Sequence, residues 1–285
     1  MTTALRIAQG RFGRVSLLDM DTPLAPHAHS QCHAIFKVSG ADSAFYINDE
    51  RLPVTERTAI LVNAWEPHYF FSEPDFPRTV YLVLYIEPEW MSSLHSPLHV
   101  AAHPRFFPQS CVALPADIRR RVDHLVALMM SLVPVSQDKL ESELFELMVA
   151  VCERYSAWGR HDALFLPPGG LVQDARINKA IAAIRSNPGQ TQDIEQLAHS
   201  VHLSRAQFFL RFKRSTGLTP AMFINMQRAE VACKRLAQES YYGSVGKLAD
   251  ELGFTDQAHF TRFIRNHLCV TPTDYQRVVH LYDGL

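Results

Sequence analysis

Two stretches near the C-terminus of this 285-residue chain repeat the same pattern. One spans residues 194–220 and the other spans 245–272, and a Thr-Pro pair closes each of them. Leu197-Ala198 recurs as Leu248-Ala249, at an offset of 51 residues that becomes 52 after an internal turn. Each copy predicts a short amphipathic helix, a tight turn and a second helix, which is the helix-turn-helix arrangement. Two linked units of this kind can place their second helices in neighbouring stretches of DNA major groove, about one helical turn apart.

Local signals in the first copy support this interpretation. Ser204 is a good N-cap for the second helix, since its hydroxyl can accept from free main-chain N–H groups. Phe208 and Phe212, four residues apart, are expected to face inward from that helix. Gly217 is expected to end the helix in a left-handed conformation. Ala198 is small enough to let the two helices of the unit cross closely.

The length and the charge distribution favour two domains with different tasks. From Asp174 onward there are 14 Lys and Arg against 10 Asp and Glu, a balance of +4; the preceding part has 14 against 19, a balance of −5, which together give −1. A cationic C-terminal part suits phosphate binding. The sequence has no apolar run near the roughly 18 residues of a membrane span and no secretory signal, so we expect a cytoplasmic protein without a membrane partner. Five scattered cysteines predict reduced thiols.

The hydrophobic pattern predicts a multidomain α+β protein with four segments. Residues 1–110 read as short strands separated by turn residues, which is typical of a β-barrel or sandwich. Residues 111–165 change to helical spacing and predict a helical hairpin, which either packs on the barrel or forms a dimer seam. Residues 166–173, with two prolines and two glycines, predict a linker. Residues 174–285 predict an all-α tandem helix-turn-helix domain.

The tandem pattern resembles the DNA-binding domain of AraC/XylS-family transcription regulators, in which a long helix joins two such units. The resemblance covers about 110 residues and implies a sequence-specific regulator of promoter DNA that is controlled by a small-molecule effector. It also implies a homodimer that works with RNA polymerase, with activation as the commoner mode. The residues that carry the resemblance are Leu197-Ala198, Ser204, Phe212-Lys213, Gly217, Thr219-Pro220, Arg228, Leu236, Leu248-Ala249, residues 253–256, residues 260–262, Thr271-Pro272 and Tyr275.

The second helix of each unit supplies the candidate DNA contacts. A lone exposed Arg, Gln or Thr is usually solvated surface, but the tandem pattern favours contacts to DNA, with Arg suited to guanine and Gln to adenine. The first unit departs from the family, because Leu210 stands where Arg is usual, and in the second unit Cys269 stands opposite Gly217. The candidates in the first unit are Arg205, Ala206, Gln207, Phe209, Leu210, Arg211, Lys213 and Arg214. Those in the second unit are Gln257, Ala258, His259, Thr261, Arg262 and Arg265.

Histidines in the N-terminal part resemble the two motifs of cupin barrels. His27, His29 and His33 are followed by Gly40, and a later Pro-containing segment ends in His68; His33 replaces the usual Glu. One interpretation is a barrel pocket for an organic effector, since regulators of this family commonly keep such histidines without metal. That pocket would be lined by His29, His33, Phe36, Trp65, His68 and Tyr81.

The other interpretation is a divalent metal held by His27, His29, His33 and His68. It leads to the alternative of a cupin metalloenzyme with a DNA-binding appendage, which rests on these four histidines and nothing else. Because no nucleophile–base pair or phosphate-binding loop stands out, the sequence predicts no enzyme and assigns no cofactor with certainty.

Overall fold

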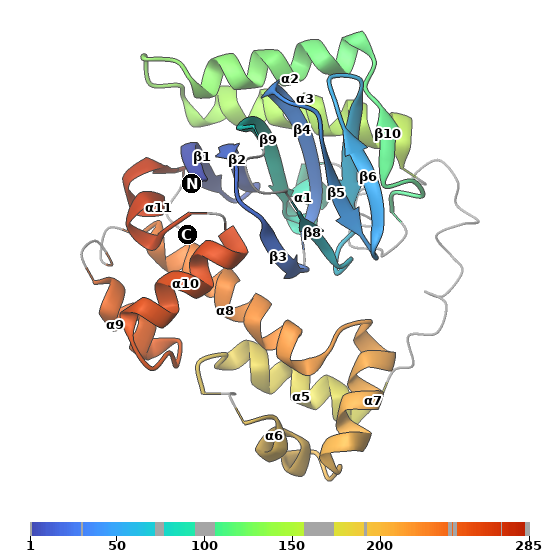
Figure 1. Cartoon of the computed structure of the whole chain (residues 1–285), viewed down its shortest axis with the longest axis vertical. Helices are drawn as coiled ribbons and strands as arrows, with labels where there is room; N and C mark the ends of the chain where they lie inside the picture. The colour runs from blue at the N-terminus through green and yellow to red at the C-terminus, as the bar shows by residue number, and fades with distance from the viewer. Residues whose placement is uncertain are drawn as a thin grey trace.

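The computed structural model describes residues 2–29, 31–71, 77–94, 106–156, 174–190, 193–238, 241, 244–268 and 270–282. A β-rich N-terminal part lies beside a helical C-terminal part, and two helices lie across the β-rich part on the side away from α5–α7 (Figure 1). The predicted linker 166–173 and Cys269 lie outside the described residues.

The N-terminal part contains two sheets. The larger has the strand order β10-β7-β4-β9-β2-β1-β11 and the smaller the order β3-β8-β5-β6. The strands are β1 (Thr3–Gly10), β2 (Gly13–Met20), β3 (Leu24–His27), β4 (Cys32–Gly40), β5 (Ser43–Ile47), β6 (Glu50–Val54), β7 (Thr58–Val62), β8 (His68–Phe70), β9 (Thr79–Ile86), β10 (Cys111–Ala113) and β11 (Val279–Leu281). The sheets confirm the β-rich N-terminal domain.

The large sheet is buried on both faces, and strand alternation decides which side chain enters which core. On β9, Tyr81, Val83 and Tyr85 face the small sheet, whereas Leu82 and Leu84 face the other way. Phe45 of β5 and Phe70 of β8 contribute to the first of these cores from the small sheet. The space between the sheets is therefore filled largely by aromatic and branched side chains.

Helices cover the outer face of the large sheet. They are α1 (Pro88–Leu94), α2 (Ala116–Met129) and α3 (Gln137–Tyr155). Ile118 and Val122 of α2 and Leu144 of α3 are buried in the core beneath them. Both helices fall within the segment predicted as a hairpin, and their apolar stripes pack on the chain's own sheet.

The C-terminal part repeats one arrangement twice, as the sequence predicts. The first unit contains α5 (Ala175–Ser186), α6 (Ile194–Ser200) and α7 (Arg205–Thr216); α8 (Pro220–Leu236) joins it to α9 (Val245–Glu251), α10 (Gln257–Leu268) and α11 (Pro272–Val278). The predicted caps are present: the Ser204 hydroxyl accepts from the main-chain N–H of Gln207, and Gly217 has a φ of 77°. Local sequence thus fixes where α7 begins and ends.

Arg228 of α8 contacts both helix-turn-helix units. It is 9% exposed, its Nε donates to the Pro188 carbonyl at 3.0 Å, and its guanidinium lies 5.5 Å from the centre of the Phe254 ring. Pro188 belongs to the first unit and Phe254 to the second. The joining helix therefore carries a buried cation that contacts both units.

The helical part is in direct contact with the β-rich part. β11 pairs in parallel with β1, with Val279 opposite Ile7, and the buried hydroxyl of Tyr275 donates to Gln9. Trp65 stacks on Phe223 of α8 with 5.2 Å between the ring centres. The prediction of an all-α C-terminal domain needs one correction, because β11 pairs with β1 of the large sheet. No local sequence pattern indicates such a long-range pairing.

None of the helices in the described part of the chain combines the length and the apolar character needed to cross a lipid bilayer. The four described cysteines are free thiols, and Cys32 and Cys152 are buried.

Candidate functional site

The outer face of α7 carries all eight residues that the sequence assigned to it. Each of them is exposed, whereas Phe208 and Phe212 are fully buried on the inner face. Phe209 and Leu210 are 45% and 70% exposed, which is unusual for large apolar side chains and gives this face an apolar patch. Apolar side chains on a recognition helix can contact thymine methyl groups.

Arg211 forms an ion pair within the protein. Its guanidinium lies 2.9 Å from a carboxylate oxygen of Asp174, the residue that also caps α5. The ion pair holds the start of α5 against α7. Arg211 is therefore less free to contact a phosphate than Arg205 or Arg214, for which no ion pair is seen within the described residues.

The corresponding face of α10 is polar. Gln257, His259, Arg262 and Arg265 are exposed, as is Ala258, while Thr261 is half-buried. Phe260 and Ile264 hold the helix from beneath. The exposed faces of the two helices therefore differ in chemistry: that of α10 carries hydrogen-bonding groups, and that of α7 carries an apolar patch flanked by cations.

A cavity of about 240 Å³ lies between the β-rich part and the helical part. Its walls come from the β1–β2 turn, residues 27–29, Gln31, the end of β9, and helices α8 and α10. Met226 and Leu268 contribute apolar surface, and Arg14, His29 and Glu230 contribute polar groups. Because both parts of the chain line it, a molecule in this cavity would contact both.

Arg14 is one of the cations that line this cavity, and it was not among the site residues predicted from the sequence. Its guanidinium lies 3.9 Å from the centre of the Tyr85 ring, and one terminal nitrogen donates to the Cys233 sulfur at 2.8 Å. Its Nε is buried without a hydrogen-bond partner. The available signal was an arginine at the start of Arg14-Val-Ser-Leu-Leu, a stretch whose other residues are mostly apolar.

The other charges of the cavity are already neutralised or held. Lys234 pairs with Glu230 at 3.1 Å, and Arg11 pairs with Glu141 of α3 at 2.9 Å. Glu87 accepts from the Gln31 amide, and burial raises the pKa of its carboxyl. Among the residues that the structure describes, no carboxylate forms an ion pair with Arg14. Burial opposes its charged form, but the neighbouring Cys233, Tyr85 and Tyr275 favour that form and raise the pKa of Arg14.

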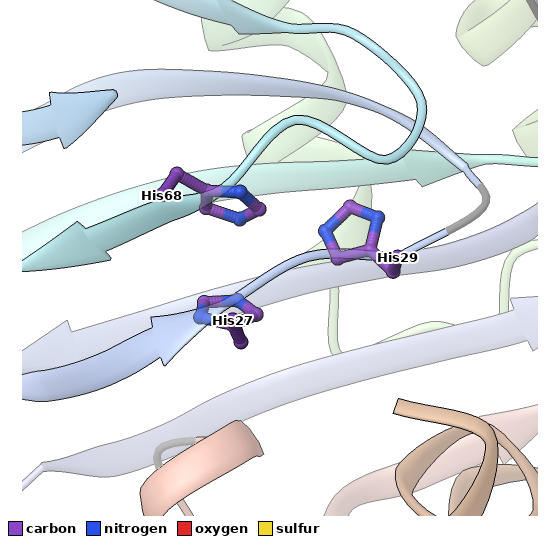
Figure 2. Close-up of side chains that lie close together, drawn as sticks. All are labelled: His27, His29 and His68. Atoms are coloured by element: carbon purple, nitrogen blue, oxygen red, sulfur yellow. The ribbon is translucent and has the colours of Figure 1, made fainter. Parts of the chain in front are cut away.

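Four histidine rings lie close together, and two of them, His27 and His29, line the same cavity. His27 lies at the end of β3, His29 in the following turn and His68 at the start of β8, and their rings converge (Figure 2). His33 stacks on Tyr85 and lies against His68, with 4.9 Å between the His33 and His68 ring centres. The rings whose nitrogens lie close enough together to hold a metal ion are those of His27, His29 and His68.

Burial keeps these imidazoles neutral. It lowers the pKa of His68 to about 3, with the nearby His29 as the next cause. Burial likewise lowers the pKa of His27, His29 and His33, and neighbouring histidines add to the effect in each case. Uncharged imidazole nitrogens are the form that can accept a hydrogen bond or coordinate a metal.

The six residues predicted to line one pocket do not all meet. His29, His33 and His68 are in contact, but Trp65 lies at the seam with α8, and Tyr81 is fully buried between the sheets beside Ser43. Phe36 faces the core beneath α2 and α3. It lies three residues from His33 on β4, so the two side chains point to opposite faces of the sheet.

Two protein families match the chain. Residues 19–148 match the AraC-like ligand binding domain, and residues 197–278 match a helix-turn-helix domain. An uncharacterized HTH-type transcriptional regulator of Haemophilus influenzae is 34% identical over 110 residues, which is 39% of this chain and 36% of that protein. The regulator MtrA of Neisseria gonorrhoeae is 29% identical over 105 residues, which is 37% and 34% of the two chains. These matches span about a third of each relative's length.

Solved structures of ToxT from Vibrio cholerae share the fold. An apo form of a ToxT variant has a TM-score of 0.58 at 11% identity and covers 93% of this chain and 97% of that one. A form with bound unsaturated fatty acid has a TM-score of 0.52 at 13% identity and covers 93% and 94%. The curated relatives are named as transcription regulators, which does not favour the metalloenzyme alternative. With a ligand-binding domain matched in its β-rich part and a helix-turn-helix domain in its helical part, the chain belongs to the AraC family of transcription regulators.

Proposed function

We propose that this protein regulates transcription by binding promoter DNA through α7 and α10, under the control of a small anionic molecule in the cavity beside Arg14. The observation that carries the DNA-binding part is the pair of exposed helix faces, each held from beneath by buried phenylalanines, Phe208 in α7 and Phe260 in α10. Such packing presents each face rigidly, which base recognition requires.

The two helices divide the work of recognition. Gln257 and Arg262 of α10 read base edges, since Gln is suited to adenine and Arg to guanine. Phe209 and Leu210 of α7 contact thymine methyl groups, and Arg205 and Arg214 contact phosphates beside them. Sequence preference then comes mainly from α10, with α7 contributing apolar contacts and register on the duplex.

The cavity supplies the control. A half-buried guanidinium without a carboxylate partner, with its Nε buried and unpaired, favours a ligand that brings its own negative charge. At about 240 Å³ the cavity suits a small metabolite, since drug-sized sites have roughly 300–1,000 Å³. Such a ligand touches β2 through Arg14 and α8 through Met226 and Glu230. Binding of such a ligand therefore favours the arrangement in which the β-rich part and the helical part are in contact over any arrangement in which they are separated.

The family membership also suggests further partners. We infer that the protein works in the cytoplasm, contacts RNA polymerase at its promoter and acts as a homodimer rather than as an enzyme. Leu132 and Val133, in the turn between α2 and α3, are 96% and 71% exposed. Exposed apolar side chains of this kind suit contact with a second copy.

Replacing Arg262 with Ala should weaken binding to the cognate site by about 1–3 kcal/mol, because a bidentate contact to guanine is worth about that much. The preferred site is first obtained by selecting bound duplexes from a random pool with the full chain and sequencing them. We expect two short conserved blocks about one helical turn apart. R262A should lose preference at one base pair within one block.

The matched control is R120A, which removes an exposed arginine from α2 on the far side of the β-rich part. It should select the same blocks with the same affinity. If R262A and R120A give identical motifs and affinities, α10 does not read bases in this way. If the full chain enriches no motif at all, the DNA-binding proposal itself is wrong.

Arg14 should decide whether an acidic ligand binds. Carboxylic acids that fit the cavity should raise the melting temperature of the wild-type protein, whereas the corresponding primary amides should not. R14M keeps a long side chain but removes the charge, and should abolish the stabilisation by acids. A thermal-shift screen of paired acids and amides measures this. Equal stabilisation of R14M and wild type by the same acid would place the ligand elsewhere.

A further inference from the structure

The protons on the four clustered histidines can be assigned from their contacts. Nδ1 of three rings lies within hydrogen-bond distance of a main-chain carbonyl oxygen, which can only accept. Each of these rings therefore carries its proton on Nδ1 and presents a bare lone pair at Nε2. The pairs are His27 with Ala25 (2.9 Å), His29 with Gln31 (3.1 Å) and His68 with Glu66 (2.9 Å).

The fourth ring supplies a single donor to this group. His33 Nδ1 lies 3.1 Å from His68 Nε2, and because that nitrogen has no proton, His33 is the donor. Nε2 of His27, His29 and His33 are then buried lone pairs without a hydrogen-bond partner among the described residues. Leaving a buried polar atom unpaired destabilises the folded protein. Two of these atoms, those of His27 and His29, converge with a ring nitrogen of His68, which indicates a missing electrophile at that point.

A proton is a poor candidate for this electrophile. Burial disfavours the charged form of each ring, and a first added proton would repel a second on its neighbours. A metal ion instead accepts several lone pairs at once. The coordinating nitrogens of His27, His29 and His68 lie within 4.8 Å of one another. A tetrahedral centre with bonds of about 2.0–2.1 Å needs roughly 3.4 Å between ligands, which small ring movements provide.

We propose that His27, His29 and His68 bind one divalent transition-metal ion through their Nε2 atoms. The donor set is made of neutral imidazoles, which suits zinc, copper, nickel or iron and disfavours magnesium and calcium. The carbonyl oxygens that fix each Nδ1–H are the usual second contacts of histidine ligands, since they hold the ring and its tautomer. Metal binding displaces the hydrogen bond from His33 to His68.

The position of the site connects it to the helical part. His27 and His68 are directly paired on β3 and β8, so an ion between them links the two strands. β3 packs against α10, and Ala28, between two of the ligands, is buried in the core of the first helix-turn-helix unit. The ion therefore stabilises the part of the small sheet that contacts the DNA-binding helices.

Metal titration of the full chain tests the site. After treatment with a chelator and dialysis, the protein is titrated with Co²⁺ and followed by its visible absorption. We expect one equivalent per chain and displacement by Zn²⁺. X-ray absorption of the zinc-loaded protein should show a shell of imidazole nitrogens at about 2.0–2.1 Å. Absence of Co²⁺ binding, or a shell of oxygens alone, would overturn the proposal.

Substitutions locate the ion. His29 is half-buried and lies outside the strands, so H29Q should keep the fold, which the melting temperature verifies. We expect it to weaken Co²⁺ binding by more than about 100-fold, beyond the 10–100-fold effect of changing an outer contact. The control is H124Q, a histidine of α2 that is 51% exposed and outside the cluster. Equal affinities for H29Q, H124Q and wild type would assign the metal to another site.

Discussion

Replacing Phe208 with Ala should destabilise the first helix-turn-helix unit by about 3–5 kcal/mol. Phe208 is fully buried, in a core that also contains Phe212 of α7 and Phe223 of α8. Removing a buried aromatic ring loses its transfer free energy and leaves a cavity that its neighbours fill only in part. Since a whole domain is stable by roughly 5–15 kcal/mol, this loss is large. Hydrogen exchange of the α5–α7 amides in the full chain measures it.

The adjacent Phe209 is the matched control. It has the same side chain on the same helix but is 45% exposed on the outer face. F209A should change stability by no more than about 0.5 kcal/mol while weakening DNA binding. Similar exchange rates in F208A and F209A would mean that the inner and outer faces of α7 have been wrongly assigned.

Replacing Tyr275 with Ala should detach the second unit from the β-rich part at a cost of about 3–5 kcal/mol, the range for other buried aromatic residues. Tyr275 is fully buried, and its hydroxyl donates to Gln9 of β1, which is 5% exposed. In Y275F only the hydroxyl is lost, and the buried Gln9 oxygen loses this donor. We expect a smaller cost of about 1–3 kcal/mol.

Exchange of the Tyr282 amide reports this contact, because its N–H donates to the Gln9 carbonyl at 2.7 Å. It should exchange faster in Y275F and fastest in Y275A. The control is Y69F, since the Tyr69 hydroxyl contacts Asp49 at the surface. Should Y275A leave the Tyr282 amide as protected as in the wild type, Tyr275 would not hold the two parts together.

The sequence alone determined the helices of the DNA-binding part and their faces. Caps such as Ser204 and Gly217, and the spacing of Phe208 and Phe212, act within a few residues, so the chain states them locally. Alternation of side chains along a strand is also a local rule, and on β4 it places Phe36 and His33 on opposite faces of the sheet. The prediction that both line one pocket was therefore an error that the sequence alone could have prevented.

The tertiary structure alone decided what meets across the chain. Arg14 contacts Cys233 across 219 residues, and β11 returns to pair with β1. His27 faces His68 because β3 and β8 pair in a particular register. Such contacts depend on which strands and helices pack together, and that choice is set by burial summed over the whole core rather than by any short segment. The recognition helices could therefore be predicted from sequence, whereas the cavity and the shape of the histidine cluster required the fold.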